Sequence, residues 1–134
     1  MKLLLAAITL TICSFSAYSQ TEWILVENSK KNDMRWEAKP GSLEFSKTKG
    51  GTPIVAVIGK TTNTKTSSIE LYKWYVSADD CGRKMGKVVS LKISGEFSFE
   101  NDFVFDSGTI ASGLAEFICG VADYAISEQR KKGL

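Results

Sequence analysis

The sequence predicts an α+β fold in which a C-terminal helix packs on one face of an antiparallel sheet and is tethered to it by a disulfide. Three observations lead to this prediction. Apolar residues recur with a period of two along most of the chain, as they do in strands. From Thr109 the period lengthens to that of an amphipathic helix. Once the N-terminal segment is removed, two cysteines remain: Cys81, before this change, and Cys119, after it.

The first 19 residues have the pattern of a secretory signal peptide. Lys2 supplies a positive charge, an apolar run covers residues 3–13, and small residues stand just before Ser19. We therefore expect cleavage between Ser19 and Gln20, which leaves residues 20–134 as a single exported domain.

Two other interpretations of this segment are weaker. The apolar run is shorter than the roughly 20 residues that a membrane anchor needs. A lipoprotein signal would require a small residue directly before Cys13, where the chain has Ile12. The expected location is therefore the periplasm, the cell surface or the medium.

Charge and composition exclude several classes of function. The chain has 17 basic and 15 acidic side chains, and loss of Lys2 leaves a net charge of +1, which predicts no nucleic-acid partner. Residues 20–134 contain no apolar stretch long enough to span a membrane. The chain has no histidine, the commonest acid–base residue, so we expect neither an enzyme nor a metal site, and no cofactor. Asp79 and Asp80, the best adjacent carboxylates, are interpreted as a turn.

Cys81 and Cys119 are expected to form a disulfide. Exported chains enter an oxidising compartment, where two thiols that lie close together pair. The alternatives are a buried free thiol or a catalytic thiolate, and the second lacks a histidine to activate it. In the chain-entropy model, closing the loop stabilises the fold by about 4 kcal/mol.

The strands are expected at intervals along residues 22–105. Glu22–Glu27 is predicted to be buried on both faces, and Ile54–Ile58 to be the central strand. Thr61–Ser68 is either a connection or the frayed end of that strand. The other expected strands are Met34–Lys39, Ser42–Phe45, Ile69–Val76, Lys87–Ser94 and Phe97–Phe105. The last of these is either a hairpin that turns at Asn101 or one long, bulged strand.

The helix is expected to begin after Ser107, a plausible N-cap, and to end near the basic residues 130–132. Gly113 and Gly120 are interpreted as points of close packing. Its apolar stripe consists of Ile110, Leu114, Phe117, Ile118, Val121 and Ala125.

The aromatic strand Ile69–Val76 carries large side chains on both faces. Because one helix covers only one face, we expect an exposed apolar strip on the other, used for partner binding or for self-association as a homodimer. Tyr72 and Trp74 are the candidate binding residues. On the neighbouring strand, Ser90, Lys92 and Ser94 are expected to face solvent. The alternative is that a loop, 28–33 or 61–68, covers the aromatic side chains.

Several features in order resemble the surface-adhesin protein E family of Gram-negative bacteria. They are a strand with Trp23 directly after the signal peptide, the segment Asp80-Cys81-Gly82-Arg83, and a Ser107-Gly108 pair that opens a helix holding Cys119. The resemblance implies a six-stranded antiparallel sheet with a disulfide-tethered helix. It also implies binding of host matrix or serum proteins such as laminin, vitronectin or plasminogen. The matching segments surround the cysteines, so no binding residue is transferred.

Two functions from different classes follow. The first is an exported, non-enzymatic protein-binding domain that resembles protein E. The second is a periplasmic inhibitor or immunity protein that neutralises a secreted cell-wall-degrading enzyme or toxin.

Overall fold

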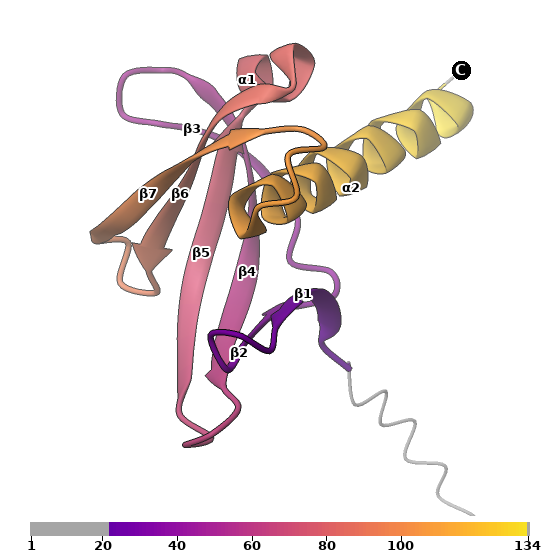
Figure 1. Cartoon of the computed structure of the whole chain (residues 1–134). Helices are drawn as coiled ribbons and strands as arrows, with labels where there is room; N and C mark the ends of the chain where they lie inside the picture. Colours follow the sequence, from indigo (N-terminus) through magenta and orange to yellow (C-terminus); the bar gives the residue numbers. More distant parts are fainter. Residues whose placement is uncertain (1–21, 134) are drawn as a thin grey trace, which may run out of the picture.

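The computed structural model describes residues 22–133 and consists of one antiparallel sheet and two helices (Figure 1). The α+β fold predicted from the sequence is confirmed. The predicted cleavage site at Ser19 and Gln20 lies outside the described residues. The strands are β1 (Ile24–Ser29), β2 (Met34–Ala38), β3 (Glu44–Lys47), β4 (Pro53–Asn63), β5 (Ile69–Ser77), β6 (Met85–Lys92) and β7 (Phe97–Val104); the helices are α1 (Ala78–Arg83) and α2 (Ile110–Lys132).

Six strands follow one another across the sheet in the order β1-β2-β4-β5-β6-β7, and β3 also pairs with β4. The central strand β4 is long enough to hold two partners on one edge: β3 pairs with its start and β2 with its end. Between them the chain leaves the sheet, and the Ile58 N–H donates to the Ser42 hydroxyl at 3.0 Å. Thr61, Thr62 and Asn63 thus belong to β4, and residues 64–66 form the turn.

The core lies between the sheet and α2. Trp74, the largest fully buried side chain, is only 1% exposed. A Cβ atom at Gly59 on β4 would overlap its ring, so the absence of a side chain there lets Trp74 lie flat against the sheet. The buried cluster contains Val55, Val57, Trp74, Val76, Val88 and Phe103 from the sheet and Leu114, Ala115, Ile118, Cys119 and Ala122 from α2.

The predicted disulfide between Cys81 and Cys119 is confirmed, with the two Cα atoms 5.6 Å apart. It joins α1 to the middle of α2. Asp79 and Asp80, interpreted as a turn from the sequence, instead form the first turn of α1, because the Ser77 hydroxyl caps the helix by accepting from the Asp80 N–H at 3.1 Å.

Further local predictions are wrong, on β1, at the N-cap of α2 and on β6. Ile24 and Leu25 of β1 are 42% and 55% exposed, so this strand is not buried on both faces; it lies at the edge of the sheet, where neighbours are fewer. The N-cap of α2 is Thr109 rather than Ser107, because the Thr109 hydroxyl accepts from the Ser112 N–H at 3.1 Å. The third concerns strand β6, whose Ser90 is 2% exposed and faces α2 rather than solvent.

Candidate functional site

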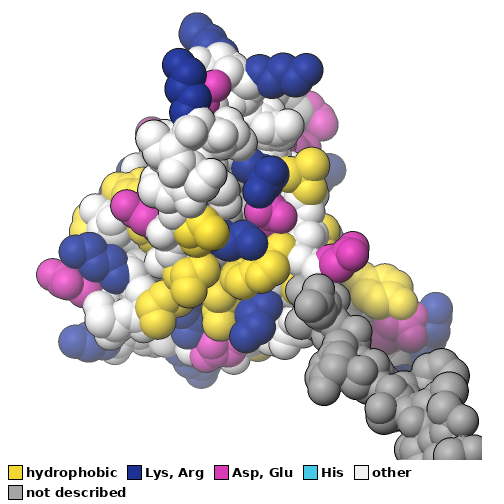
Figure 2. Space-filling view, turned by 90° about the horizontal axis from the view of Figure 1, so that it is seen from below, with side chains coloured by type: hydrophobic (Ala, Val, Ile, Leu, Met, Phe, Trp, Pro, Cys, Tyr) yellow, Lys and Arg dark blue, Asp and Glu magenta, His cyan; other side chains and the backbone are white. Residues whose placement is uncertain are grey.

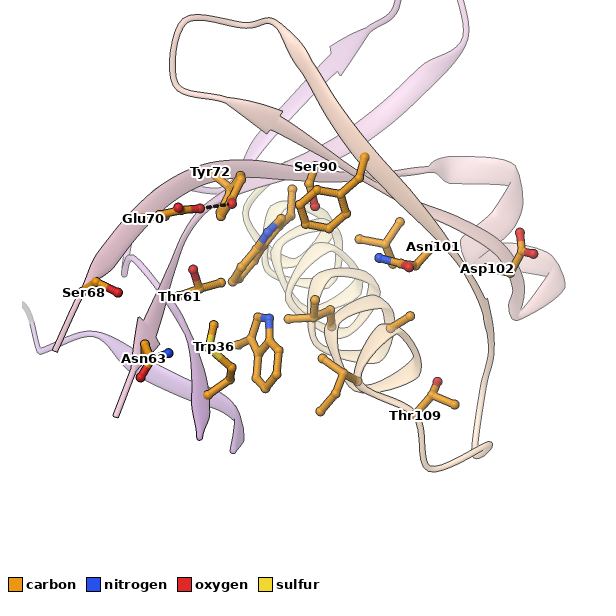
Figure 3. Close-up of a pocket in the computed structure, with 17 residues that line it drawn as sticks. Trp36, Thr61, Asn63, Ser68, Glu70, Tyr72, Ser90, Asn101, Asp102 and Thr109 are labelled. Carbon is orange, nitrogen blue, oxygen red and sulfur yellow. Dashed lines mark hydrogen bonds between the residues drawn. The ribbon is translucent and has the colours of Figure 1, made fainter. Parts of the chain in front are cut away.

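A cleft of about 680 Å³ opens between the start of α2 and the face of the sheet that α2 covers only in part (Figure 3). The helix begins near the middle of β4 and β5 and runs away to the upper right, so the lower ends of these two strands are left uncovered (Figure 1). The cleft is lined by Met34, Trp36, Thr61, Asn63, Ser68, Glu70, Tyr72, Trp74, Val88, Ser90, Phe99, Asn101, Asp102, Thr109, Ile110, Ala111 and Leu114.

Aromatic side chains from three strands contribute to the lining. Trp74 is fully buried and belongs to the core beneath the cleft, whereas Trp36 on β2 is half-buried. Phe99 on β7 is 42% exposed, and Tyr72 meets it edge-on with the ring centroids 5.7 Å apart. Phe99 and Trp36 therefore present aromatic surface to a ligand, while Trp74 holds the sheet and helix together.

Polar side chains surround this aromatic surface. Asn63, Glu70 and Tyr72 come from β4 and β5, and Asn101 comes from β7 on the other side (Figure 3). Asp102 also borders the cleft, but by the alternation of β7 its side chain points to the other face of the sheet, where it forms an ion pair with Lys87 at 3.1 Å. No lysine or arginine is among the described residues that line the cleft.

The Tyr72 hydroxyl donates a hydrogen bond to the Glu70 carboxylate (Figure 3). Burial, followed by this hydrogen bond and the negative charge of Glu70, raises the pKa of Tyr72 to about 12. The phenol is therefore neutral at physiological pH and remains a hydrogen-bond donor.

Tyr72 and Trp74, the binding residues expected from the sequence, both line this cleft rather than the opposite face of the sheet. The register of β5 with its two neighbouring strands explains why these residues lie on the cleft side. Trp74 lies opposite Val57 on β4 and Ser90 on β6, and directly paired residues point to the same face, here toward α2. Trp74 is therefore a core residue and cannot itself contact a partner.

Sequence reasoning did not select Trp36, Phe99 or Asn101 for this site. They come from β2 and β7, which lie on opposite sides of β4, β5 and β6. The alternating pattern of each strand is visible in the sequence, but no local signal indicates that these two strands border the same cleft.

An exposed apolar strip, as expected, lies on the face of the sheet opposite α2, and it contains Ile69 and Leu71 rather than Tyr72 and Trp74. Ile69 and Leu71 of β5 are 57% and 46% exposed, and Phe97 of β7 is 58% exposed. Leu91 on β6 pairs with Phe97 on one side and, on the other, with Lys73, two residues along β5 from Leu71. We call Ile69, Leu71, Leu91 and Phe97 the open-face strip.

A bulge separates Phe97 from Phe99. Phe99 lies opposite Ser90, which faces the cleft, and Phe97 lies opposite Leu91, which faces away from it; the register shifts between Ser90 and Leu91. The two phenylalanines therefore serve different surfaces although they have the same parity in the sequence. Of the two predicted alternatives for this segment, the bulged strand is the one observed, with no turn at Asn101.

The loops suggested as covers leave the strip open. The exposed fractions of Ile69 and Leu71 show that neither residues 28–33 nor residues 61–68 shield it.

A second hollow, of about 720 Å³, lies between the start of β4, α1 and the C-terminal half of α2. Phe45 and Ile126 at its border are 51% and 39% exposed. It lacks the combination of aromatic walls and uncharged polar groups found in the cleft.

Within residues 22–133, no group of three or more potential metal ligands lies together. By length and composition alone, α2 could cross a membrane, but the apolar residues of its first half, among them Leu114 and Ile118, are buried against the sheet.

Comparison with known proteins gives no relative from which a function could be read. No family model matches the chain, and no curated protein or solved structure matches it significantly.

Proposed function

We propose that this protein is an exported, non-enzymatic binding domain, similar in kind to surface-adhesin protein E, which engages a protein partner through the open-face strip. The observation that carries the proposal is the exposure of Ile69, Leu71 and Phe97 on one face of the sheet. Contiguous exposed apolar side chains on a soluble domain are typical of interaction surfaces.

Ion pairs on the same face support this assignment. Lys73 pairs with Glu44 at 2.8 Å, and Lys87 pairs with Glu100 and Asp102 at 3.4 and 3.1 Å. An apolar centre with a charged, hydrated border is the usual anatomy of a protein interface. The view from below shows hydrophobic side chains lying among basic and acidic ones (Figure 2).

The class of partner comes from the resemblance described above. A signal peptide without a lipoprotein motif fits a protein secreted or held at the cell surface by other means. Host matrix or serum proteins, of the kind represented by laminin, vitronectin and plasminogen, are the partners that we propose.

The experiment measures binding of residues 20–134, with the disulfide intact, to immobilised laminin, vitronectin and plasminogen. We expect Leu71→Ser and Phe97→Ser each to weaken binding to the bound protein about tenfold, as for residues at the centre of an interface. Tyr124→Ser is the matched control, because Tyr124 is an apolar residue 68% exposed on α2, away from the strip. Failure of the wild-type domain to bind any of the three, or equal binding by Leu71→Ser and wild type, would contradict the proposal.

The β4–β5 hairpin favours a second candidate, an inhibitor of a cell-wall-degrading enzyme. Its turn extends past the ends of the neighbouring strands (Figure 1). The turn is well fixed, because the Asn63 side chain accepts from the Lys65 and Thr66 N–H groups at 3.0 and 3.1 Å. Lys65, with its side chain 80% exposed, could enter an active site that contains carboxylates. Inhibition of a peptidoglycan hydrolase that is lost in Lys65→Glu, together with retention in the periplasm, would favour this function over the first.

A further inference from the structure

The cleft beside α2 has a chemistry different from that of the open-face strip. Its exposed surface combines aromatic rings with amide, hydroxyl and carboxylate groups, and it lies on the other face of the sheet. We propose that this cleft binds a neutral oligosaccharide, an activity independent of the protein-binding function proposed above.

The aromatic surface fits the apolar side of a sugar ring. One face of a pyranose consists of C–H groups, which pack favourably against the flat face of an aromatic side chain. Phe99 is 42% exposed and Trp36 is half-buried, and they belong to strands on opposite sides of the cleft. An oligosaccharide that spans the cleft from β2 to β7 would cover both rings.

The polar groups around the cleft match the hydroxyl groups at the edge of a sugar. Each amide offers two donors and an acceptor, and Asn101 makes no side-chain hydrogen bond within the described residues. Asn63 uses its oxygen in the hairpin turn, which leaves its NH₂ group as a donor. The Glu70 carboxylate adds an acceptor, fixed in place by the Tyr72 hydroxyl (Figure 3).

The charges of the residues that line the cleft distinguish a neutral sugar from a sulfated or uronate sugar. Among the described residues that line the cleft there is no lysine or arginine to hold a sulfate or a uronate, and Glu70 would repel one. Asp102 is paired with Lys87, and Glu70 is hydrogen-bonded to the neutral Tyr72 phenol, which leaves Glu70 as a single carboxylate without a cationic partner among the described residues that line the cleft. The lining therefore favours a neutral sugar over an acidic one, and a lysine-rich peptide tests the cationic alternative.

The size of the cleft agrees with this ligand. Pockets for small molecules usually have volumes of about 300–1,000 Å³, and this one has about 680 Å³. Because Phe99 and Asn101 are exposed at its border, a longer chain could continue out of the cleft into solvent.

The experiment uses the disulfide-intact domain of residues 20–134, with chitotetraose and cellotetraose as neutral probes. Binding is measured by tryptophan fluorescence, since Trp36 and Trp74 both border the cleft, and by amide chemical shifts. We expect saturable binding of at least one probe, with shifts confined to residues of the cleft. Phe99→Ala should weaken binding about tenfold, the loss of one stacking contact, and Asn101→Ala should weaken it several-fold.

Phe97→Ala is the matched control: the same residue type on the same strand and similarly exposed, but on the opposite face. It should leave sugar binding unchanged, and Phe99→Ala should leave protein capture unchanged, which separates this proposal from the proposed function. If Phe99→Ala lowers the melting temperature, Asn101→Ala serves as the test. The proposal is overturned if neither neutral probe shifts any cleft residue at about 10 mM, tenfold above a Kd of 1 mM. It is also overturned if a heparin tetrasaccharide or a lysine-rich peptide binds the cleft in preference to the neutral probes.

Discussion

At the scale of single residues, the position of Trp74 depends on its neighbours across the sheet. Its strand carries large side chains on both faces, so either face could have been covered by α2. Gly59, diagonally across from it on β4 and opposite Tyr72, provides the space that the indole ring occupies on the helix side. A tryptophan in an aromatic strand therefore becomes core because of a glycine that is distant from it in the sequence.

The first prediction concerns the titration of Tyr72. Because its folded pKa is raised from 10.0 to about 12, the unfolded chain loses this proton at lower pH than the folded protein does. The stabilisation is therefore complete below pH 10 and is lost as the pH rises toward 12. We expect the Tyr72 ring signal in a ¹³C NMR titration to remain that of the neutral phenol at pH 10.5, about one and a half units below the folded pKa.

Glu70→Gln tests the cause of this shift. Removing the negative charge should lower the Tyr72 pKa while burial, the largest contribution, keeps it above 10.0. Tyr72→Phe identifies the signal by eliminating it. Ionisation of Tyr72 at pH 10 in the wild-type domain would contradict the hydrogen-bonded, partly desolvated geometry of the cleft.

At the scale of elements, the two glycines within α2 have different roles. Both were expected to be points of close packing. Gly113 fits that expectation, because a Cβ there would overlap the Glu27 side chain of β1. Gly120 does not fit it: it is exposed, and a Cβ there would have no neighbour within 4 Å.

The second prediction follows from this difference. Gly120→Ala should stabilise the domain by about 0.5–1 kcal/mol, because alanine loses less backbone entropy in a helix and meets no obstacle. Gly113→Ala should raise the free energy of unfolding by less than Gly120→Ala does, or should lower it, since the Glu27 side chain must move. Urea denaturation of both variants with the disulfide intact measures the difference. A loss of stability in Gly120→Ala would show that this turn of α2 is packed against something in solution.

The bulge in β7 is the element-scale feature on which the two proposed surfaces depend. Without the register shift, Phe97 and Phe99 would point to the same face. With it, one phenylalanine joins the open-face strip and the other joins the cleft.

At the scale of the whole molecule, α2 is joined to the rest of the chain by the Cys81–Cys119 disulfide at its middle and by its apolar face. Beyond Ala122, the last buried residue of α2, the helix continues past the sheet without further buried side chains (Figure 1). The disulfide and the buried side chains therefore both hold the N-terminal half of α2 against the sheet.

The third prediction concerns this tether. The cysteines are 38 residues apart, and in the chain-entropy model their removal should lower the free energy of unfolding by about 4 kcal/mol. Urea denaturation of a variant carrying both Cys81→Ser and Cys119→Ser measures it. Before this comparison, intact mass should show two hydrogens fewer in the purified, non-reduced domain than in the reduced chain. Two thiols open to alkylation in the folded protein would contradict the disulfide.

The sequence alone determined what depends on local pattern. Period-two and helical spacing located the strands and α2 to within a few residues, and the two cysteines of residues 20–134 predicted their own disulfide. The faces of the sheet were decided only by the tertiary structure. A strand's alternation divides its residues into two sets without indicating which set a helix will cover, so Tyr72 and Trp74 were expected on the open face and lie on the other. That choice depends on register, on the bulge that separates Phe97 from Phe99 and on the space above Gly59. All three are properties of neighbouring strands, which are remote in the sequence and come together only when the sheet forms.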